Sequence, residues 1–191
     1  MPLLTKHMLY SQVIKQKNYE KIMHLLRRDI ITLIPYVLFL FLLLAVELGI
    51  YYLLKNLFPE LFLKNFTLAI LYLVAFIYTL SVWLFFYTAF VNYFLDMWII
   101  TNDRIVDIRQ KGLFARVVAE LDLFRVQDVT SEAHGIFATM FDFGNVYIQT
   151  AGEQERFVFY NIPEPHKIRE AIIRLADEDR KFHNADMMKE Q

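Results

Sequence analysis

The stretch NFTLAILYLVAFIYTLSVWLFFYTAFVNYFL, residues 65–95, decides the fold because it runs for 31 residues without a charged side chain. A helix needs about 20 apolar residues to cross a hydrocarbon core of about 30 Å. The stretch exceeds that length and therefore predicts a membrane-spanning helix, about 66–94. A soluble core is a poor alternative, because the roughly 100 residues outside the apolar region are too few to cover helices that are apolar all round.

A second apolar stretch lies just before it, from Ile30 to Leu54, with Glu47 as its only charge. The link of about ten residues, 55–64, makes the two predicted helices antiparallel neighbours in a hairpin. Aromatic rings with a polar edge favour the headgroup zone of a bilayer. We therefore expect Tyr51 and Tyr52 at the membrane interface on the loop side, and Tyr93 and Trp98 at the opposite interface.

The distribution of charge gives the hairpin a direction. Residues 1–29 carry six Lys and Arg against two acids, and the hairpin loop carries only Lys55 and Lys64. Because positive charge is retained in the cytoplasm, we expect a multi-pass protein of the cell membrane with both termini cytoplasmic. The basic arm, 1–29, has apolar residues at roughly helical spacing. It could be an amphipathic helix on the inner leaflet, or a cytoplasmic extension of the first helix that packs on the soluble domain.

After Leu95 the periodicity changes from helical to two-fold. Alternation is clearest at residues 116–123, where Val117, Ala119 and Leu121 share a face opposite Arg116 and Glu120, as in a half-buried antiparallel strand. Further short strands are expected at 97–101, 105–109, 126–131, 145–150 and 156–160, with an apolar, irregular segment at 135–143. A helix begins near Pro165, and the polar tail, 177–191, frays or extends it. The fold class is therefore an α+β membrane protein: a hairpin, then a small antiparallel sandwich or barrel with a C-terminal helix.

Several short motifs follow one another along the chain. They are Trp98-Ile-Ile-Thr-Asn-Asp-Arg104, Gly112, Arg125-Val-Gln-Asp-Val129, Phe143-Gly-Asn-Val146, Thr150-Ala-Gly152 and Ile162-Pro163. Together they resemble the bacterial PH-like (pleckstrin-homology-like) membrane-flanked domain family. The resemblance covers about residues 93–176 and implies a bent antiparallel sheet closed by the C-terminal helix, here 96–176. It also implies that the chain is not an enzyme and that self-association is plausible. Val126 stands where Ile is commoner, and Glu164 is a weaker cap than Asp.

The sequence offers no constellation for catalysis. There is no cysteine, the five histidines lack metal-ligand spacing, and the glycines form no phosphate loop or dinucleotide fingerprint. We therefore expect no enzymatic activity, no cofactor and no metal. Nucleic-acid binding is disfavoured because no basic face accompanies the aromatic residues.

Three functions remain open. The first is a PH-like domain held at the inner leaflet for protein interaction or assembly, with the bilayer and either a second copy or another membrane protein as partners. The second is an anionic-lipid-binding module using Arg104, Arg109, Lys111 and Arg116, although residues 96–191 carry 12 basic against 17 acidic side chains. The third is a subunit of an oligomeric transporter or pore, with Glu47, Thr79 and Asn92 lining a path.

Overall fold

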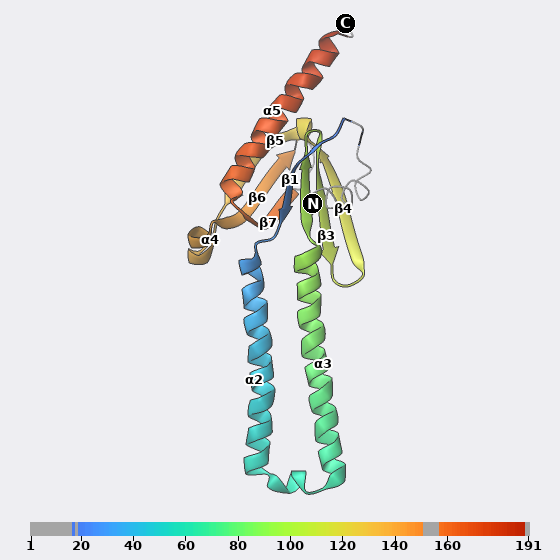
Figure 1. Cartoon of the computed structure of the whole chain (residues 1–191), viewed down its shortest axis with the longest axis vertical. Helices are drawn as coiled ribbons and strands as arrows, with labels where there is room; N and C mark the ends of the chain where they lie inside the picture. Colours follow the sequence, from blue (N-terminus) through green and yellow to red (C-terminus); the bar gives the residue numbers. More distant parts are fainter. Residues whose placement is uncertain (1–16, 18, 151–156, 190–191) are drawn as a thin grey trace, which may run out of the picture. The chain divides into compact units, whose positions relative to one another are not determined.

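The computed structural model describes residues 17, 19–150 and 157–189, with side chains up to Phe182. It divides into two units: the β unit, residues 1–29, 95–111 and 116–191, and the helical hairpin, residues 30–94 with 112–115. The elements of the two units are drawn in Figure 1. In chain order they are β1 Ile22–Arg27, η1 Ile30–Leu33, α2 Ile34–Leu57, η2 Pro59–Phe62, α3 Asn65–Leu95, β2 Met97–Thr101, β3 Arg104–Lys111, β4 Ala115–Asp122, η3 Leu123–Arg125, β5 Val126–Glu132, α4 Ile136–Phe141, β6 Phe143–Thr150, β7 Phe157–Pro163 and α5 Pro165–Lys189.

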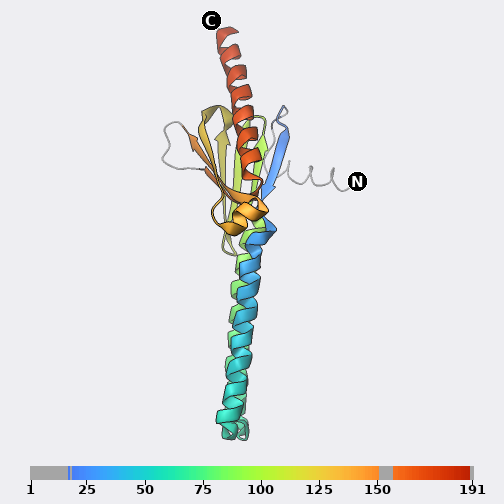
Figure 2. The same ribbon diagram turned by 90° about the vertical axis from the view of Figure 1, so that its left-hand side faces the viewer.

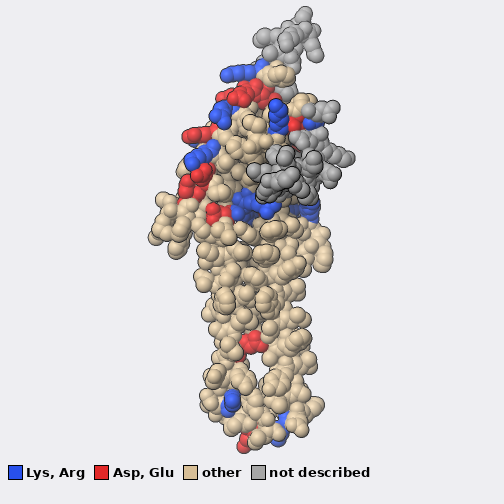
Figure 3. All heavy atoms as spheres, viewed as in Figure 1, with Lys and Arg blue, Asp and Glu red and all other residues tan. Residues whose placement is uncertain are grey.

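The helical hairpin consists of α2 and α3 joined by η2. Phe39 meets Phe85 edge to face, the Tyr78 hydroxyl donates to the Leu43 carbonyl, and Glu47 meets Thr79, so the helices run antiparallel as predicted. Both helices are long and apolar enough to cross a membrane, and only 6% of either apolar window is buried. A core helix of a soluble protein would be mostly buried, so membrane association is the better account. The surface in Figure 3 agrees, since charged side chains gather over the β unit and are sparse on the hairpin.

The β unit contains two antiparallel sheets. One has the order β1-β2-β3-β4 and the other β5-β6-β7. Their inner faces and α5 close on one core, in which the rings of Trp98 and Phe159 lie 5.5 Å apart. Ile168, Ile172 and Leu175 form the predicted apolar stripe of α5 and belong to that core. The α5 helix packs on β5 and η3 and then continues past the strands (Figure 2).

The predicted strands of the domain are all present, and the alternating faces of β4 are confirmed. The sequence Ala151-Gly152-Glu153 also predicts a hairpin turn between the last two strands, and this turn lies outside the described residues. The apolar segment predicted to be irregular contains a short helix, α4. It begins after Gly135, whose φ of 99° suits glycine, and it ends before Asp142, whose backbone is in the left-handed region.

Part of the basic arm differs from both expectations. Residues 1–16 lie outside the described part of the chain, but residues 22–27 form strand β1 rather than a helix. The strand pairs with β2 through Leu26↔Trp98 and Arg27↔Met97. Leu26 joins the core, and the pairing satisfies backbone groups at the edge of β2 that would otherwise be open. The helical hairpin is therefore inserted between two neighbouring, hydrogen-bonded strands.

Candidate functional site

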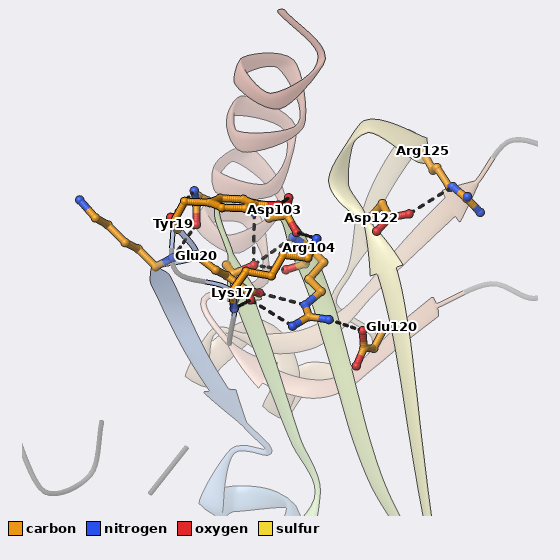
Figure 4. A network of polar contacts seen from close by, with 11 residues as sticks. Lys17, Tyr19, Glu20, Asp103, Arg104, Glu120, Asp122 and Arg125 are labelled. Atoms are coloured by element: carbon orange, nitrogen blue, oxygen red, sulfur yellow. Dashed lines mark hydrogen bonds and ion pairs between the residues drawn. The ribbon is translucent and has the colours of Figure 1, made fainter. Parts of the chain in front are cut away.

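The turn between β2 and β3 carries a network of polar contacts (Figure 4). Arg104, the first residue of β3, reaches Glu20 with two nitrogens, at 2.9 Å from Nε to Oε1 and 3.0 Å from Nη2 to Oε2. Its third contact, through Nη1, is with Glu120 of β4. The Glu20 side chain is buried, so this bidentate pair joins the segment before β1 to β3 in a water-poor environment.

The hydrogen bonds at Glu20 decide its protonation state. Burial alone would raise the pKa of the carboxyl, but donors from Arg104 and the Lys17 backbone N–H outweigh burial and hold that pKa below its ordinary value of 4.5. Glu20 is therefore ionised at neutral pH, and the network stays charged.

The tip of the same turn is tied to the segment before β1. Lys17 Nζ lies 2.6 Å from Asp103 Oδ2, and the Tyr19 hydroxyl donates to Asp103 Oδ1 at 3.3 Å. The Lys21 backbone N–H donates to Asn102 Oδ1 at 2.6 Å. The hydrogen bond with Asp103 raises the pKa of Lys17. A groove of about 850 Å³ opens beside these contacts. Its lining combines acids with aromatic rings: Lys17, Tyr19, Asn102, Asp103, Asp122, Phe124, Glu178, Asp179 and Phe182.

The four basic residues predicted to bind lipid do not converge. Arg104 and Lys111 stand at opposite ends of β3, about 23 Å apart at 3.3 Å per residue. Arg104 is held by its two acids, and Arg109 lies 2.9 Å from Asp107. Only Lys111 and Arg116 are exposed together, on either side of the β3–β4 turn. Phe114 in that turn is 98% exposed, and the Gly112 N–H donates to Asn92 of α3.

A second ionic cluster lies where the chain leaves and re-enters the β unit. Arg28 Nη2 is 2.6 Å from Asp96 Oδ2, and Asp96 Oδ1 accepts from the Gln110 backbone N–H at 2.7 Å. Nearby, Asp107 is fully buried, and neither of its oxygens accepts a well-aligned hydrogen bond within the described part of the chain. Burial raises the pKa of Asp107 to about 6; Arg109 opposes this rise and Asp96 adds to it.

Among the predicted interface residues, Trp98 is a correction. Its exposed fraction is 0% and its ring packs in the core, because strand pairing points it inward against Phe159. It therefore does not reach a headgroup zone. Tyr51 and Tyr52 are exposed on the last turns of α2, and Tyr93 is partly buried near the end of α3. Their place at a membrane interface stays a prediction.

The hairpin brings together two of the three residues proposed to line a path. The Thr79 hydroxyl lies 2.8 Å and 2.9 Å from the two Glu47 carboxylate oxygens and 3.0 Å from the Ala75 carbonyl. Asn92 is 13 residues further along α3, about 20 Å away at 1.5 Å per residue. Glu47 also lines an apolar cavity of about 340 Å³ between the helices. In the described residues, no group of three or more His, Cys, Asp and Glu could hold a metal.

Sequence reasoning missed the Glu20–Arg104 pair and the groove. The two residues of the pair are 84 positions apart, and only their opposite charges link them in the sequence. No local pattern marks Glu20 as buried, since the strand that buries it was itself predicted to be helical.

Two antiparallel sheets closing on one C-terminal helix define a PH-like class of domain. A family model described as "Bacterial PH domain" matches residues 30–176. The chain therefore belongs to the bacterial PH domain family, and the resemblance inferred from its motifs is confirmed.

Two solved structures are each similar to part of the chain. One is a DUF1696 family protein with a pleckstrin-homology domain from Shewanella loihica PV-4, at 16% identity and a TM-score of 0.36, covering 42% of this chain and 70% of that one. The other is a pleckstrin homology domain from Shewanella amazonensis SB2B, at 18% identity and a TM-score of 0.33, covering 42% and 74%. No curated protein matches the chain.

Proposed function

We propose that this chain is a non-enzymatic membrane protein whose PH-like unit binds a protein partner at the cytoplasmic face of the membrane. The single observation that carries the proposal is the acidic, aromatic-lined groove beside the β2–β3 turn. Its carboxylates fit a basic segment of a partner, and its rings fit the apolar stems and charged heads of Lys and Arg. The one lysine of the lining, Lys17, is already paired with Asp103.

The arrangement of charge argues against an anionic headgroup at this groove. Arg104 lies next to the groove, but its guanidinium already contacts two carboxylates. An anion there would meet Asp103, Asp122 and Glu178 at close range, and like charges at an interface are repelled. A partner with basic side chains meets the opposite sign.

The membrane orientation supports the same proposal. Arg27 and Met97 are paired residues, so the chain leaves and re-enters the β unit at neighbouring positions. Both ends of the hairpin must therefore lie on one side of any membrane that it crosses. The six basic residues of 1–29 favour the cytoplasm as that side.

Peptide binding to the full chain in zwitterionic nanodiscs tests the proposal. A fluorescent peptide rich in Lys, Arg and aromatic residues is titrated beside an analogue with Asp and Glu in the basic positions. We expect the basic peptide alone to bind, and Glu178→Lys to weaken that binding by roughly tenfold. Glu170→Lys is the matched control: it makes the same charge change two turns earlier on α5, outside the groove lining. If both variants weakened peptide binding equally, the peptide would be responding only to the net charge of the protein and not to the groove.

An anionic-lipid role is the second candidate, and one observation favours it at a different place. The exposed turn between β3 and β4 presents Phe114 between Lys111 and Arg116, an aromatic residue flanked by basic ones. If the turn binds anionic lipid, its backbone amides should exchange more slowly in anionic than in zwitterionic nanodiscs. The double variant Lys111→Gln, Arg116→Gln should abolish that difference. No difference in the unmodified chain would remove the candidate.

A further inference from the structure

The short helix α4 exposes more apolar surface than folding of the β unit requires. Of its six residues only Ala138 is buried. Ile136, Phe137, Met140 and Phe141 are large, apolar and between 47% and 84% exposed. Single exposed apolar residues are ordinary on protein surfaces, but a contiguous group marks a contact surface.

Hydrogen bonds place α4 at a particular end of the β unit. Asp142, directly after α4, accepts from the Glu164 backbone N–H at 2.8 Å. Asn161 lies three residues before Glu164, and its backbone carbonyl accepts a hydrogen bond from the Asp29 backbone N–H at 2.7 Å. Three residues of extended chain span about 10 Å. The end of α4 is therefore close to Asp29, which is covalently joined to Ile30, the first residue of η1.

The re-entry point of the chain lies at the same end. Arg27 pairs with Met97, and Arg28 bridges to Asp96, the residue that follows α3. The Arg28 guanidinium also lies 5.9 Å from the centre of the Tyr160 ring. This end therefore combines the exposed apolar residues of α4 with basic side chains, and the chain enters the helical hairpin after Asp29 and leaves it before Asp96.

We propose that α4 is an interfacial contact of the β unit with the lipid bilayer, its exposed apolar side chains entering the headgroup–acyl boundary where the chain passes into the membrane. The inference rests on the membrane-spanning hairpin of the proposed function. We choose lipid as the partner of α4 because of the position of this helix in the chain. A bilayer crossed by α2 and α3 has its headgroup zone at Asp29 and Asp96. Apolar residues beside basic ones suit that zone.

The absence of native cysteine allows a direct test on the full chain. An environment-sensitive fluorophore is attached to a single cysteine at Phe137, at Ile77 of α3, or at Phe182 of α5, each in nanodiscs. Phe182 is exposed and 17 residues into α5, about 25 Å from its start. We expect blue-shifted emission and quenching by nitroxide-labelled lipid at 77 and 137, and quenching by aqueous iodide alone at 182.

The three labels separate the failures. Lipid quenching at 77 without lipid quenching at 137 would overturn the role of α4 while leaving the membrane hairpin intact. Loss of lipid quenching at both would overturn the hairpin as well. A label at 137 shielded from iodide and from lipid nitroxide would show that protein covers α4, which also overturns the proposal.

A variant gives a second readout. With the fluorophore at Met140, Phe137→Glu should abolish lipid quenching, because a carboxylate resists transfer into the acyl boundary. Ile173→Glu, an exposed position of α5 outside the groove lining, is the matched control and should leave quenching at 140 unchanged. Unchanged quenching in Phe137→Glu would contradict the proposal, and unchanged far-ultraviolet circular dichroism confirms that the variant is folded.

Discussion

Glu20 and Asp107 are both carboxylates buried in the β unit, but their surroundings differ. Glu20 accepts two guanidinium hydrogen bonds and one from a backbone N–H. Asp107 has Arg109 at 2.9 Å without a well-aligned hydrogen bond. Donors therefore hold the pKa of Glu20 below 4.5, while burial raises that of Asp107 to about 6. Burial alone does not set the sign of a pKa change; the number of aligned donors decides it.

Removing the donor of the well-matched acid should have the largest effect. Arg104→Met leaves Glu20 buried without its guanidinium, and breaking such a pair costs about 3–5 kcal/mol of unfolding free energy. Urea unfolding of the full chain in detergent micelles measures this, followed by Trp98 fluorescence in a Trp83→Phe background. A loss below about 1 kcal/mol would mean that the pair is no better than an exposed one.

The poorly matched acid should appear as an effect of pH. Between about pH 4 and pH 6 folded Asp107 keeps a proton that the unfolded chain has lost, so stability falls as pH rises through that window. The change is about 3 kcal/mol at 1.4 kcal/mol per pH unit. Glu20 acts with the opposite sign, since its contribution is lost as pH falls below 4.5.

Asp107→Asn should remove the fall between pH 4 and pH 6 and leave the loss below pH 4.5. The measurement is urea unfolding at a series of pH values, with the exposed Asp177→Asn as control. If Asp107→Asn and Asp177→Asn changed the pH dependence of the unfolding free energy in the same way, Asp107 would not titrate in this range.

The smallest effect is expected at the outer arm of Arg104. Glu120 is about half exposed, and an exposed ion pair contributes up to about 1 kcal/mol. Glu120→Gln should therefore lower the unfolding free energy by less than about 1 kcal/mol in the same assay, and added salt should reduce the difference. An effect as large as that of Arg104→Met would show that the three residues act as one unit.

The features that sequence predicted are those set by local pattern. The two long apolar helices follow from uninterrupted apolar length, and β4 follows from strict alternation at 116–123. Strand β1 was missed because Ile22, Met23 and Leu26 fit a helical spacing, and its partner β2 lies some 75 residues away. Trp98 was misplaced because an aromatic residue after a span can face either a headgroup or a core. The groove draws on four separate segments, so no single stretch of sequence predicts it.

The pairing of Arg27 with Met97 also has a consequence for biosynthesis. Strand β1 leaves the ribosome first, and about 70 residues must follow before β2 appears, roughly 4–14 s at ordinary synthesis rates. In a hairpin that crosses a membrane, as proposed above, β1 waits for β2 through that interval and pairs with it only where both helices bring β2 to the same side of the membrane. A chain in which one helix failed to cross would leave the two strands on opposite sides, unable to pair. Under the proposed topology, completion of the first sheet acts as a check that the hairpin has inserted as a unit.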